Sequence, residues 1–264
     1  MRGFRRCGTG ASALLVQWIG VPAVSSAVVR VLAEDRRLAA QLPPDELTTA
    51  TQQLVAAEVR VPEGPWRPDG LLGGTPGDLG FLVVDGLLSR ELRVGRHGVA
   101  ELVGRKDILR PWDVDEGSGA PVQHESAWRV LRPTRLAVLD ARFAALAGRF
   151  PPLIAELLSR TLRRSRDLTL LLAIAAMPRL DARLLAALWH LADRWGHVGP
   201  EGTLLPVRLT HETLAGLVGA QRPSVTTALR TLERRGALRR DAGGGWILLG
   251  DPPGDAEQAV ARAG

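Results

Sequence analysis

Residues 209–249 constrain this chain most, because they follow one another in the order that two short helices and a hairpin require. Thr210 is a good helix N-cap, and apolar residues follow it at helical spacing: Leu214, Leu217 and Val218. Gly219 can end that helix in a tight turn. A second helix is predicted from Arg222, because Pro223 suits a first helical turn, where its missing N–H would have no partner.

The second predicted helix has one apolar face and ends at a glycine. Val225, Leu229 and Leu232 recur at helical spacing, and Gly236 follows them. Residues 237–249 then predict a short hairpin around three consecutive glycines. Two helices joined by a tight turn and followed by a hairpin are typical of a winged helix-turn-helix.

The polar face of the second helix has the side chains that recognise DNA. Arginine can bridge the O6 and N7 atoms of guanine, Gln can pair with adenine, and Ser and Thr contact phosphates or bases. The candidate base-contacting residues are Gln221, Arg222, Ser224, Thr226, Thr227 and Arg230. The candidate phosphate contacts are Thr210, Arg234, Arg235 and Arg239, with Arg240 beside them. An ordinary solvated helix carries similar charges, but the ordered series of cap, turn, helix and hairpin favours double-stranded DNA as the partner.

At these residues the chain resembles the cyclic-AMP receptor protein/FNR (Crp/Fnr) family of bacterial transcriptional regulators. Residues 209–240 match the pattern L-T-x-E-x-L-A-x-L-V-G-x-x-R-x-S-V-x-x-x-L-x-x-L-E-x-x-G-x-L-x-R. The resemblance implies that Arg222 contacts guanine in the major groove. Two further base-contacting residues of the family, an acid and an arginine, would fall at Pro223 and Thr227, so a different operator sequence is implied.

Composition narrows the remaining classes of protein. The 264 residues suffice for one or two domains, and the formal net charge of +6 favours an anionic partner. Cys7 is the only cysteine, which excludes an internal disulfide and a four-cysteine iron–sulfur cluster of the kind that some family members use to sense oxygen. A DNA-binding chain without disulfides is expected in the cytoplasm.

Residues 1–30 leave several interpretations open. Three early arginines precede an apolar stretch over residues 11–29, a pattern that also occurs in secretory and twin-arginine signals. Polar residues and a proline interrupt the stretch too often for a transmembrane helix, so no membrane partner is expected. We interpret residues 1–30 as a disordered extension or as the product of a start codon assigned too early.

Residues 31–150 predict the first domain of an α+β chain, and the family resemblance implies a sensory role for it. Two helices are expected over residues 31–59, on either side of a Pro-Pro pair. Four strands are then expected at residues 57–62, 80–92, 96–103 and 124–140. Glycine and proline turns separate them at intervals typical of an antiparallel β-barrel or jelly roll. Their position upstream of the helix-turn-helix resembles the cyclic-nucleotide-binding domain of the same family.

The candidate effector pocket departs from the family pattern. The resemblance implies a Gly-Glu pair for the ribose and an Arg-Ser/Thr-Ala run for the cyclic phosphate, but Glu125 stands where the phosphate-binding arginine is implied. A carboxylate repels a phosphate, so cyclic AMP is not expected and no cofactor is predicted. The residues that could bind another anion or a ring are Arg110, Trp112, Ser126, Ala127, Trp128 and Arg129. In the alternative interpretation the tryptophans fill the barrel and the arginines are solvated.

No pattern of catalysis or metal binding accompanies these features. The five histidines have no metal-ligand spacing with the cysteine or with one another. No nucleophile–base pattern, phosphate loop or dinucleotide fingerprint is present. We therefore expect neither a metal site nor enzyme activity.

Residues 151–178 predict a single long dimerisation helix. Leucines recur on more than one side of it, and one small barrel cannot bury both sides, so a second subunit is the economical partner. The alternative is a core helix of a monomer. Pro178 is expected to mark a hinge, Asp181 to cap the next helix, and residues 204–209 to form a strand. The winged helix-turn-helix domain is placed at residues 179–250, before a tail at 251–264 that is expected to be disordered.

The sequence therefore favours a homodimeric, sequence-specific DNA-binding transcription regulator that acts on a palindromic operator. Its sensory domain would respond to an unknown small-molecule effector, and RNA polymerase is a candidate partner. The alternative class is a ligand-binding signalling protein whose helix-turn-helix serves as a protein-interaction surface.

Overall fold

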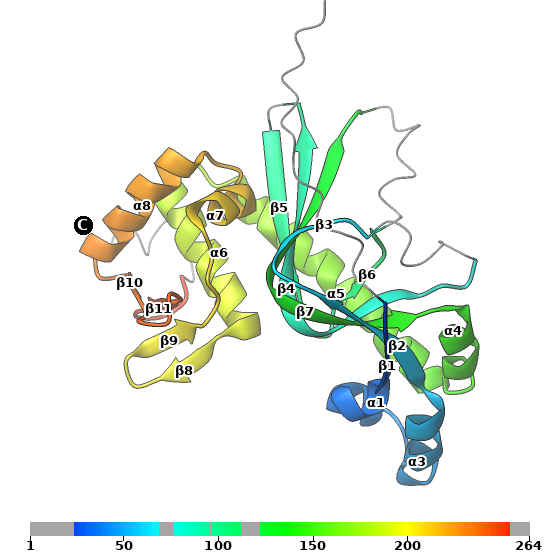
Figure 1. Cartoon of the computed structure of the whole chain (residues 1–264). Coiled ribbons are helices and arrows are strands. Elements are labelled where there is room, and N and C mark those ends of the chain that lie inside the picture. Colours follow the sequence, from blue (N-terminus) through cyan, green and yellow to red (C-terminus); the bar gives the residue numbers. More distant parts are fainter. Residues whose placement is uncertain (1–23, 69–75, 96, 112–121, 254–264) are drawn as a thin grey trace, which may run out of the picture.

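The computed structural model describes residues 24–68, 76–95, 97–111 and 122–253 (Figure 1). An antiparallel sheet comes first, then one long helix, and then a domain of three helices with a second antiparallel sheet. This is the predicted α+β architecture. None of the helices in these ranges combines the length and the apolarity that crossing a membrane requires.

Among the described residues, the first sheet contains seven strands, all paired antiparallel. They are β1 (Val24–Arg30), β2 (Val55–Val61), β3 (Gly64–Trp66), β4 (Gly80–Val94), β5 (His97–Gly104), β6 (Ile108–Leu109) and β7 (Glu125–Leu139). The order is β1-β2-β7-β4-β5, with β3 beside β7 and β6 beside β4. The four strands expected from the sequence correspond to β2, β4, β5 and β7, because alternating apolar residues and flanking glycines predicted them.

One face of this sheet encloses an apolar core with aromatic residues at its centre. Trp66, Phe81 and Trp128 are all buried there. The rings of Trp66 and Trp128 meet edge to face with centroids 5.9 Å apart, a favourable aromatic geometry. Trp128, one of the two tryptophans that the sequence offered for ring stacking, therefore packs on a side chain of its own domain.

The first strand corrects the interpretation of residues 1–30 as an extension. β1 pairs with β2 in the register Val28 with Ala57 and Val29 with Ala56. Adjacent β-branched valines favour a strand, and Val29 is buried in the core. The rest of that interpretation, residues 1–23, lies outside the described residues.

Short helices cover the end of the sheet. They are α1 (Val31–Glu34), α2 (Arg36–Ala39), α3 (Pro44–Gln53) and α4 (Ala141–Ala147). The first predicted helix is thus two helices, because the Asp35 carboxylate accepts a hydrogen bond from the Leu38 N–H (3.1 Å) and starts α2. The second ends at Gln53 rather than near residue 59, where β2 already continues the chain.

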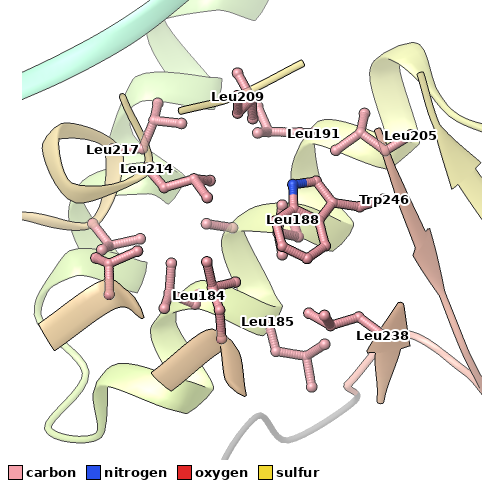
Figure 2. Close-up of a cluster of buried hydrophobic side chains, with 14 of the residues drawn as sticks. Leu184, Leu185, Leu188, Leu191, Leu205, Leu209, Leu214, Leu217, Leu238 and Trp246 are labelled. Carbon is pink, nitrogen blue, oxygen red and sulfur yellow. The ribbon is translucent and has the colours of Figure 1, made fainter. Parts of the chain in front are cut away.

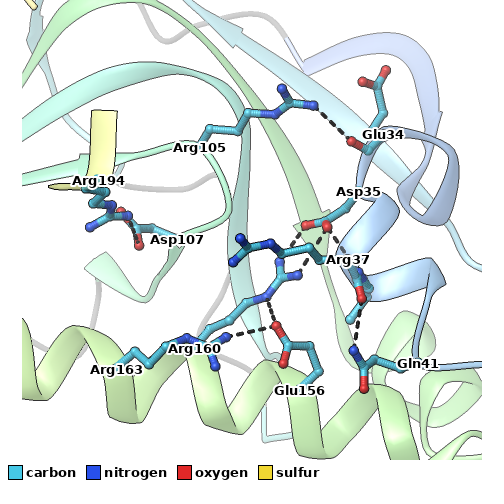
Figure 3. A network of polar contacts seen from close by, with 11 residues as sticks. Glu34, Asp35, Arg37, Gln41, Arg105, Asp107, Glu156, Arg160, Arg163 and Arg194 are labelled. Atoms are coloured by element: carbon cyan, nitrogen blue, oxygen red, sulfur yellow. Dashed lines mark hydrogen bonds and ion pairs between the residues drawn. The ribbon is translucent and has the colours of Figure 1, made fainter. Parts of the chain in front are cut away.

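A buried ion-pair network ties these short helices to the long helix α5 (Pro151–Ala175) (Figure 3). Arg160 of α5 is only 7% exposed, and its Nη1 and Nη2 donate to Asp35 at 2.5 and 3.1 Å. Its Nε donates to Glu156 at 2.9 Å. Burial acts to raise the pKa of Asp35, but the hydrogen bonds and the charge of Arg160 outweigh burial and leave that pKa below its ordinary value.

The second domain is built around α6 (Leu180–Trp195) (Figure 2). The other elements are β8 (His197–Gly199), β9 (Gly202–Leu205), α7 (His211–Val218), α8 (Arg222–Arg234), β10 (Leu238–Arg240) and β11 (Trp246–Leu248). The sheet order is β10-β11-β9-β8. Trp246, Leu184 and Leu188 are buried in its core. The strand expected at residues 204–209 is β9, displaced toward the N-terminus because Pro206 follows it.

Asp181 does not cap α6 as the sequence suggested. Arg179 is the N-cap residue, and Asp181 lies in the first helical turn, where a carboxylate suits the helix dipole. Its carboxylate instead binds two arginines: Arg179 Nη2 at 2.9 Å and Arg235 Nη1 at 2.9 Å. Asp181 thereby joins the start of α6 to the end of α8.

The second domain packs against strand β5 of the first sheet. A Cβ on Gly216 of α7 would lie 2.8 Å from the Ala100 side chain, so the two elements touch with no room for a larger residue. Arg194 of α6 also forms an ion pair with Asp107 (2.5 Å), whose other oxygen accepts from the Gly104 N–H. The two domains therefore share both packing and charge contacts.

Replacing Asp35 with Ala should lower the free energy of unfolding by about 3 kcal/mol. This is the lower end of the range for breaking a buried ion pair, because Glu156 still partners Arg160. Urea unfolding followed by circular dichroism measures the loss. Asp45→Ala is the matched control: Asp45 is exposed in the first turn of α3, and its loss should cost less than about 1 kcal/mol. Equal losses in the two variants would contradict the role of the network.

Candidate nucleic-acid interface

Helices α7 and α8 have the local features that a helix-turn-helix requires. The Thr210 hydroxyl oxygen accepts a hydrogen bond from the Thr213 N–H (3.0 Å) and caps α7 as predicted. Gly219 follows α7 with φ +61°, a left-handed conformation that glycine adopts without strain. Pro223 lies in the first turn of α8. These positions fix a tight turn between the two helices.

Helix α8 divides its residues between the core and solvent. Val225, Ala228, Leu229 and Leu232 are buried against the domain core. Of the residues expected to contact bases, Gln221, Arg222, Ser224, Thr227 and Arg230 are exposed, and Thr226 is half-buried. In the described structure no hydrogen bond or ion pair engages the guanidinium of Arg222 or Arg230. Both cations are therefore free for an anionic or base partner.

The predicted phosphate contacts fall into two groups. Thr210 and Arg234 are exposed, and Arg234 has only a 3.3 Å hydrogen bond to Thr231 of its own helix. Arg235 instead forms the ion pair with Asp181 and is 28% exposed. Arg239 is exposed but pairs with Glu201. The structure therefore gives Arg235 a structural partner that the sequence order did not reveal.

The hairpin β10–β11 carries Arg240 beside the turn at residues 242–244. Its guanidinium carbon lies 3.6 Å from the centre of the Trp246 ring, a cation–π arrangement. Burial lowers the pKa of Arg240, partly offset by the negative charge of Glu233. Arg208 donates from Nε to the Gly243 carbonyl oxygen (2.7 Å). An open recess lies between these side chains, lined by Arg208, Leu209, Thr210, Arg240, Ala242, Gly243 and Gly244.

His211 is a residue of this surface that sequence reasoning assigned no role. Its Nδ1 lies 2.8 Å from the Thr226 hydroxyl of α8, and its Nε2 lies 3.3 Å from Arg240 Nη2. The imidazole thus bridges helix α8 and the hairpin. Its place directly after the N-cap of α7 was the signal available in the sequence, since helix N-termini attract phosphate.

Of the residues proposed for an effector pocket, those that the structure describes do not converge, which corrects that grouping. Along β7, Ser126 and Trp128 face the interior, whereas Ala127 and Arg129 are exposed on the opposite face, as the two-residue period of a strand requires. Arg110 is exposed, next to Gly80 of β4. Trp112 lies outside the described residues. These residues were grouped because they are close in the sequence, but consecutive strand residues point to opposite faces of the sheet.

Chemical groups for catalysis or metal binding were not predicted. Within the described ranges, no group of three or more His, Cys, Asp or Glu side chains is arranged to hold a metal ion. The buried carboxylates Asp35 and Glu58 are instead paired with arginines. Arg135 bonds Glu58 at 2.7 Å, and that bond holds the pKa of Glu58 below its ordinary value despite burial.

Comparison with known proteins identifies the family. Residues 182–254 match the model of the Crp-like helix-turn-helix domain. The chain is 30% identical over 185 residues to a CRP-like cAMP-activated global transcriptional regulator of Mycobacterium tuberculosis (strain CDC 1551 / Oshkosh), covering 67% of this chain and 78% of that protein. The chain belongs to the Crp/Fnr family. It is a Crp-like transcriptional regulator with a helix-turn-helix DNA-binding domain.

Solved structures share the Crp/Fnr fold. A cyclic nucleotide-binding domain containing protein from Listeria monocytogenes superposes with a TM-score of 0.58 at 16% identity, covering 81% of this chain and 96% of that one. A CooA mutant from Carboxydothermus hydrogenoformans gives 0.55 at 16% identity, covering 89% and 95%. A transcriptional regulator of the Crp/Fnr family from Thermus thermophilus gives 0.52 at 22% identity, covering 78% and 100%. The predicted fold, an antiparallel-sheet domain followed by helices and a C-terminal helix-turn-helix, matches the Crp/Fnr fold of these structures.

Arg234 and Arg235 provide a matched test of which cations meet phosphate. Arg234→Ala should reduce the slope of log affinity against log salt by about 1, because one phosphate contact is lost. Arg235→Ala should leave that slope unchanged and instead lower the free energy of unfolding by about 1 kcal/mol, through loss of the pair with Asp181. Fluorescence anisotropy with labelled duplex DNA and urea unfolding give the two quantities. A reduced salt slope for Arg235→Ala, together with an unchanged slope for Arg234→Ala, would contradict the assignment of Arg234 to phosphate and Arg235 to the ion pair.

Proposed function

We propose that this Crp/Fnr regulator acts as a homodimer on a palindromic operator, and that cyclic AMP is not its effector. The main support for this proposal is the surface of α8. Arg222 and Arg230 are exposed and unpaired within the described structure, while the apolar face of the helix is buried. A helix presented in this way fits the major groove of DNA. RNA polymerase is the partner through which such a regulator would act.

The dimer proposal rests on an unpartnered leucine stripe along α5. Leu158, Leu162 and Leu172 are 59%, 55% and 66% exposed. These positions lie within a narrow sector of the helix at 3.6 residues per turn. Ser165 and Thr169 lie on the same side between Leu162 and Leu172. Exposed leucines confined to one sector of a helix are costly in water and are typical of a helix that meets another helix. A two-fold dimer would place two α8 helices for two half-sites of a palindrome.

The proposal about the effector rests on the interior of the first sheet. The M. tuberculosis relative is described as cAMP-activated. In this chain Trp66 and Trp128 pack together in the interior, and Arg90 lies over the Trp128 ring at 5.8 Å. Glu125, at the start of β7, is the residue that stands in place of the family's phosphate-binding arginine. The packed rings disfavour a nucleotide in this interior. Glu125 is exposed on the opposite side of β7 from Trp128, so its contribution is the missing arginine of the family pattern and not a charge in the interior.

Selection of bound DNA from a random pool, with and without cyclic AMP, tests the proposal directly. We expect the full chain to enrich a two-fold palindrome equally in both conditions. Enrichment only with cyclic AMP would overturn the effector proposal. No enrichment in either condition, together with affinity that does not change with salt, would favour the alternative in which the helix-turn-helix contacts a protein.

Arg222→Ala should cost about 1–3 kcal/mol of binding free energy on the selected operator and relax specificity at one base pair. The reason is loss of a bidentate contact between the guanidinium and a guanine. Titration against the operator and against single-base variants measures the effect. A loss of equal size on all sequences would make Arg222 a phosphate contact instead.

Leu158→Glu should convert the dimer to a monomer, because it places a charge in the leucine stripe. Leu170→Glu is the matched control: Leu170 is also exposed on α5, at 49%, but lies about 120° around the helix from Leu158. Sedimentation velocity gives the mass of each variant. A dimeric Leu158→Glu variant, or dissociation of both variants, would place the interface elsewhere.

A further inference from the structure

The His211 imidazole lies at the junction of three elements that surround the DNA-binding surface. It is the first residue of α7, and its two ring nitrogens contact Thr226 of α8 and Arg240 of β10. Thr226 continues the chain of contacts, because its hydroxyl donates to the Arg222 carbonyl oxygen at 3.1 Å. The imidazole is therefore connected both to the residue expected to contact guanine and to the hairpin.

The partners of His211 define its protonation state. Arginine has only donors, so Arg240 Nη2 must donate to His211 Nε2, which must then carry no proton. The ring proton lies on Nδ1 and is donated to the Thr226 hydroxyl oxygen, and the Thr226 proton goes to the Arg222 carbonyl oxygen. Each group in this chain donates to the next, from Arg240 through His211 and Thr226 to the Arg222 carbonyl oxygen. The contacts of the free protein therefore fit a neutral imidazole.

The surrounding charges favour the same state. Arg240 of β10 and Arg222 and Arg230 of α8 disfavour a positive ring, whereas Glu233 of α8 favours one. Arg208 lines the same recess as Arg240. Burial and then the charge of Arg240 are the largest causes that lower the pKa of His211 below its ordinary value near 6.5. Because three arginines disfavour a proton on the ring and only one carboxylate favours it, the His211 imidazole is neutral near pH 7.

A DNA phosphate at this surface would add negative charge beside His211 and so favour the protonated imidazole. The recess beside Arg240 is also lined by Thr210, the N-cap of α7, and a helix N-terminus attracts phosphate. A protonated His211 keeps its Nδ1–H bond to Thr226 and gains an Nε2–H donor that can no longer face Arg240. A phosphate oxygen between the two side chains would accept from both.

We propose that His211 is a phosphate-contacting residue that takes up a proton when DNA binds, so that His211 and Arg240 together clamp one backbone phosphate. The inference deepens the proposed function and rests on its DNA-binding surface. The clamp is independent of base sequence, because it contacts only the backbone. Thr226 acts in it as a positioning residue, since its hydroxyl holds the ring through Nδ1.

The sign of the pH dependence follows from proton uptake. Between the pKa of His211 in the free protein and its higher pKa on DNA, binding consumes a proton. DNA affinity must therefore fall as pH rises through that window, by at most about tenfold per pH unit. Below the free pKa and above the bound pKa, His211 contributes no pH dependence.

Fluorescence anisotropy with a labelled random-sequence duplex, at constant ionic strength from about pH 5.5 to 8, tests the proposal. The wild-type affinity should fall by about tenfold over this range, which corresponds to a rise of about one unit in the pKa of His211 on DNA. His211→Gln should lose most of this pH dependence, because Gln does not titrate. His197→Gln, at an exposed position of β8 in the same domain, should behave like wild type.

A second measurement keeps the test independent of how the variant folds. NMR titration of the wild-type imidazole resonances should show one histidine whose pKa rises on DNA, and that resonance should be missing in His211→Gln. Equal pH dependence in wild type and His211→Gln, or an unchanged pKa on DNA, would overturn the clamp while leaving DNA binding intact. Absence of DNA binding at every pH would instead overturn the DNA-binding surface itself.

Discussion

Burial of one face of α8 determines which residues of this protein can meet DNA. Val225, Leu229 and Leu232 pack on the core around α6, and each buried side chain of this kind contributes about 1.5–3 kcal/mol. With that face fixed, the helical period leaves Arg222 and Arg230 on the outside. The ion pair between Asp181 and Arg235 then holds the far end of α8 against the start of α6. Packing thus sets the orientation, and the polar contacts refine it.

The apolar cluster that buries α8 also includes residues of the first domain. Leu87 and Leu102 of the first sheet join the apolar cluster of the second domain, and Gly216 approaches Ala100 too closely for any larger residue at that position. The Arg194–Asp107 pair adds a charged contact beside this packing. A displacement of the sheet would therefore displace α7, whose N-cap Thr210 is one of the predicted phosphate contacts. The first domain and the helix-turn-helix domain are therefore joined by a shared apolar cluster and an ion pair.

Local patterns predicted most of the fold, and contacts between distant segments explain what was missed. The cap at Thr210, the turn at Gly219 and the apolar face of α8 all depend on residues a few positions apart, so one sequence suffices to find them. Strand β1 needs β2 as its partner, and Arg160 binds Asp35 from a segment far along the chain. The division of the first predicted helix has a local cause that was missed, because Asp35 caps α2 through the Leu38 N–H. The pocket grouping failed for a local reason: consecutive residues of β7 face opposite sides, which the family motif alone did not indicate.

The difference between Arg235 and Arg240 shows why the charge of a segment does not identify its phosphate contacts. Both lie in the same basic run, yet Arg235 is neutralised by Asp181, whereas Arg240 stacks on Trp246 and donates to an uncharged imidazole. A cation paired with a carboxylate must break that pair to bind phosphate. A cation held by a ring and a neutral histidine keeps its charge available, and the histidine can add a second one when phosphate arrives. The positive charge that DNA meets on this surface therefore depends on the partners of each arginine and not on the number of arginines.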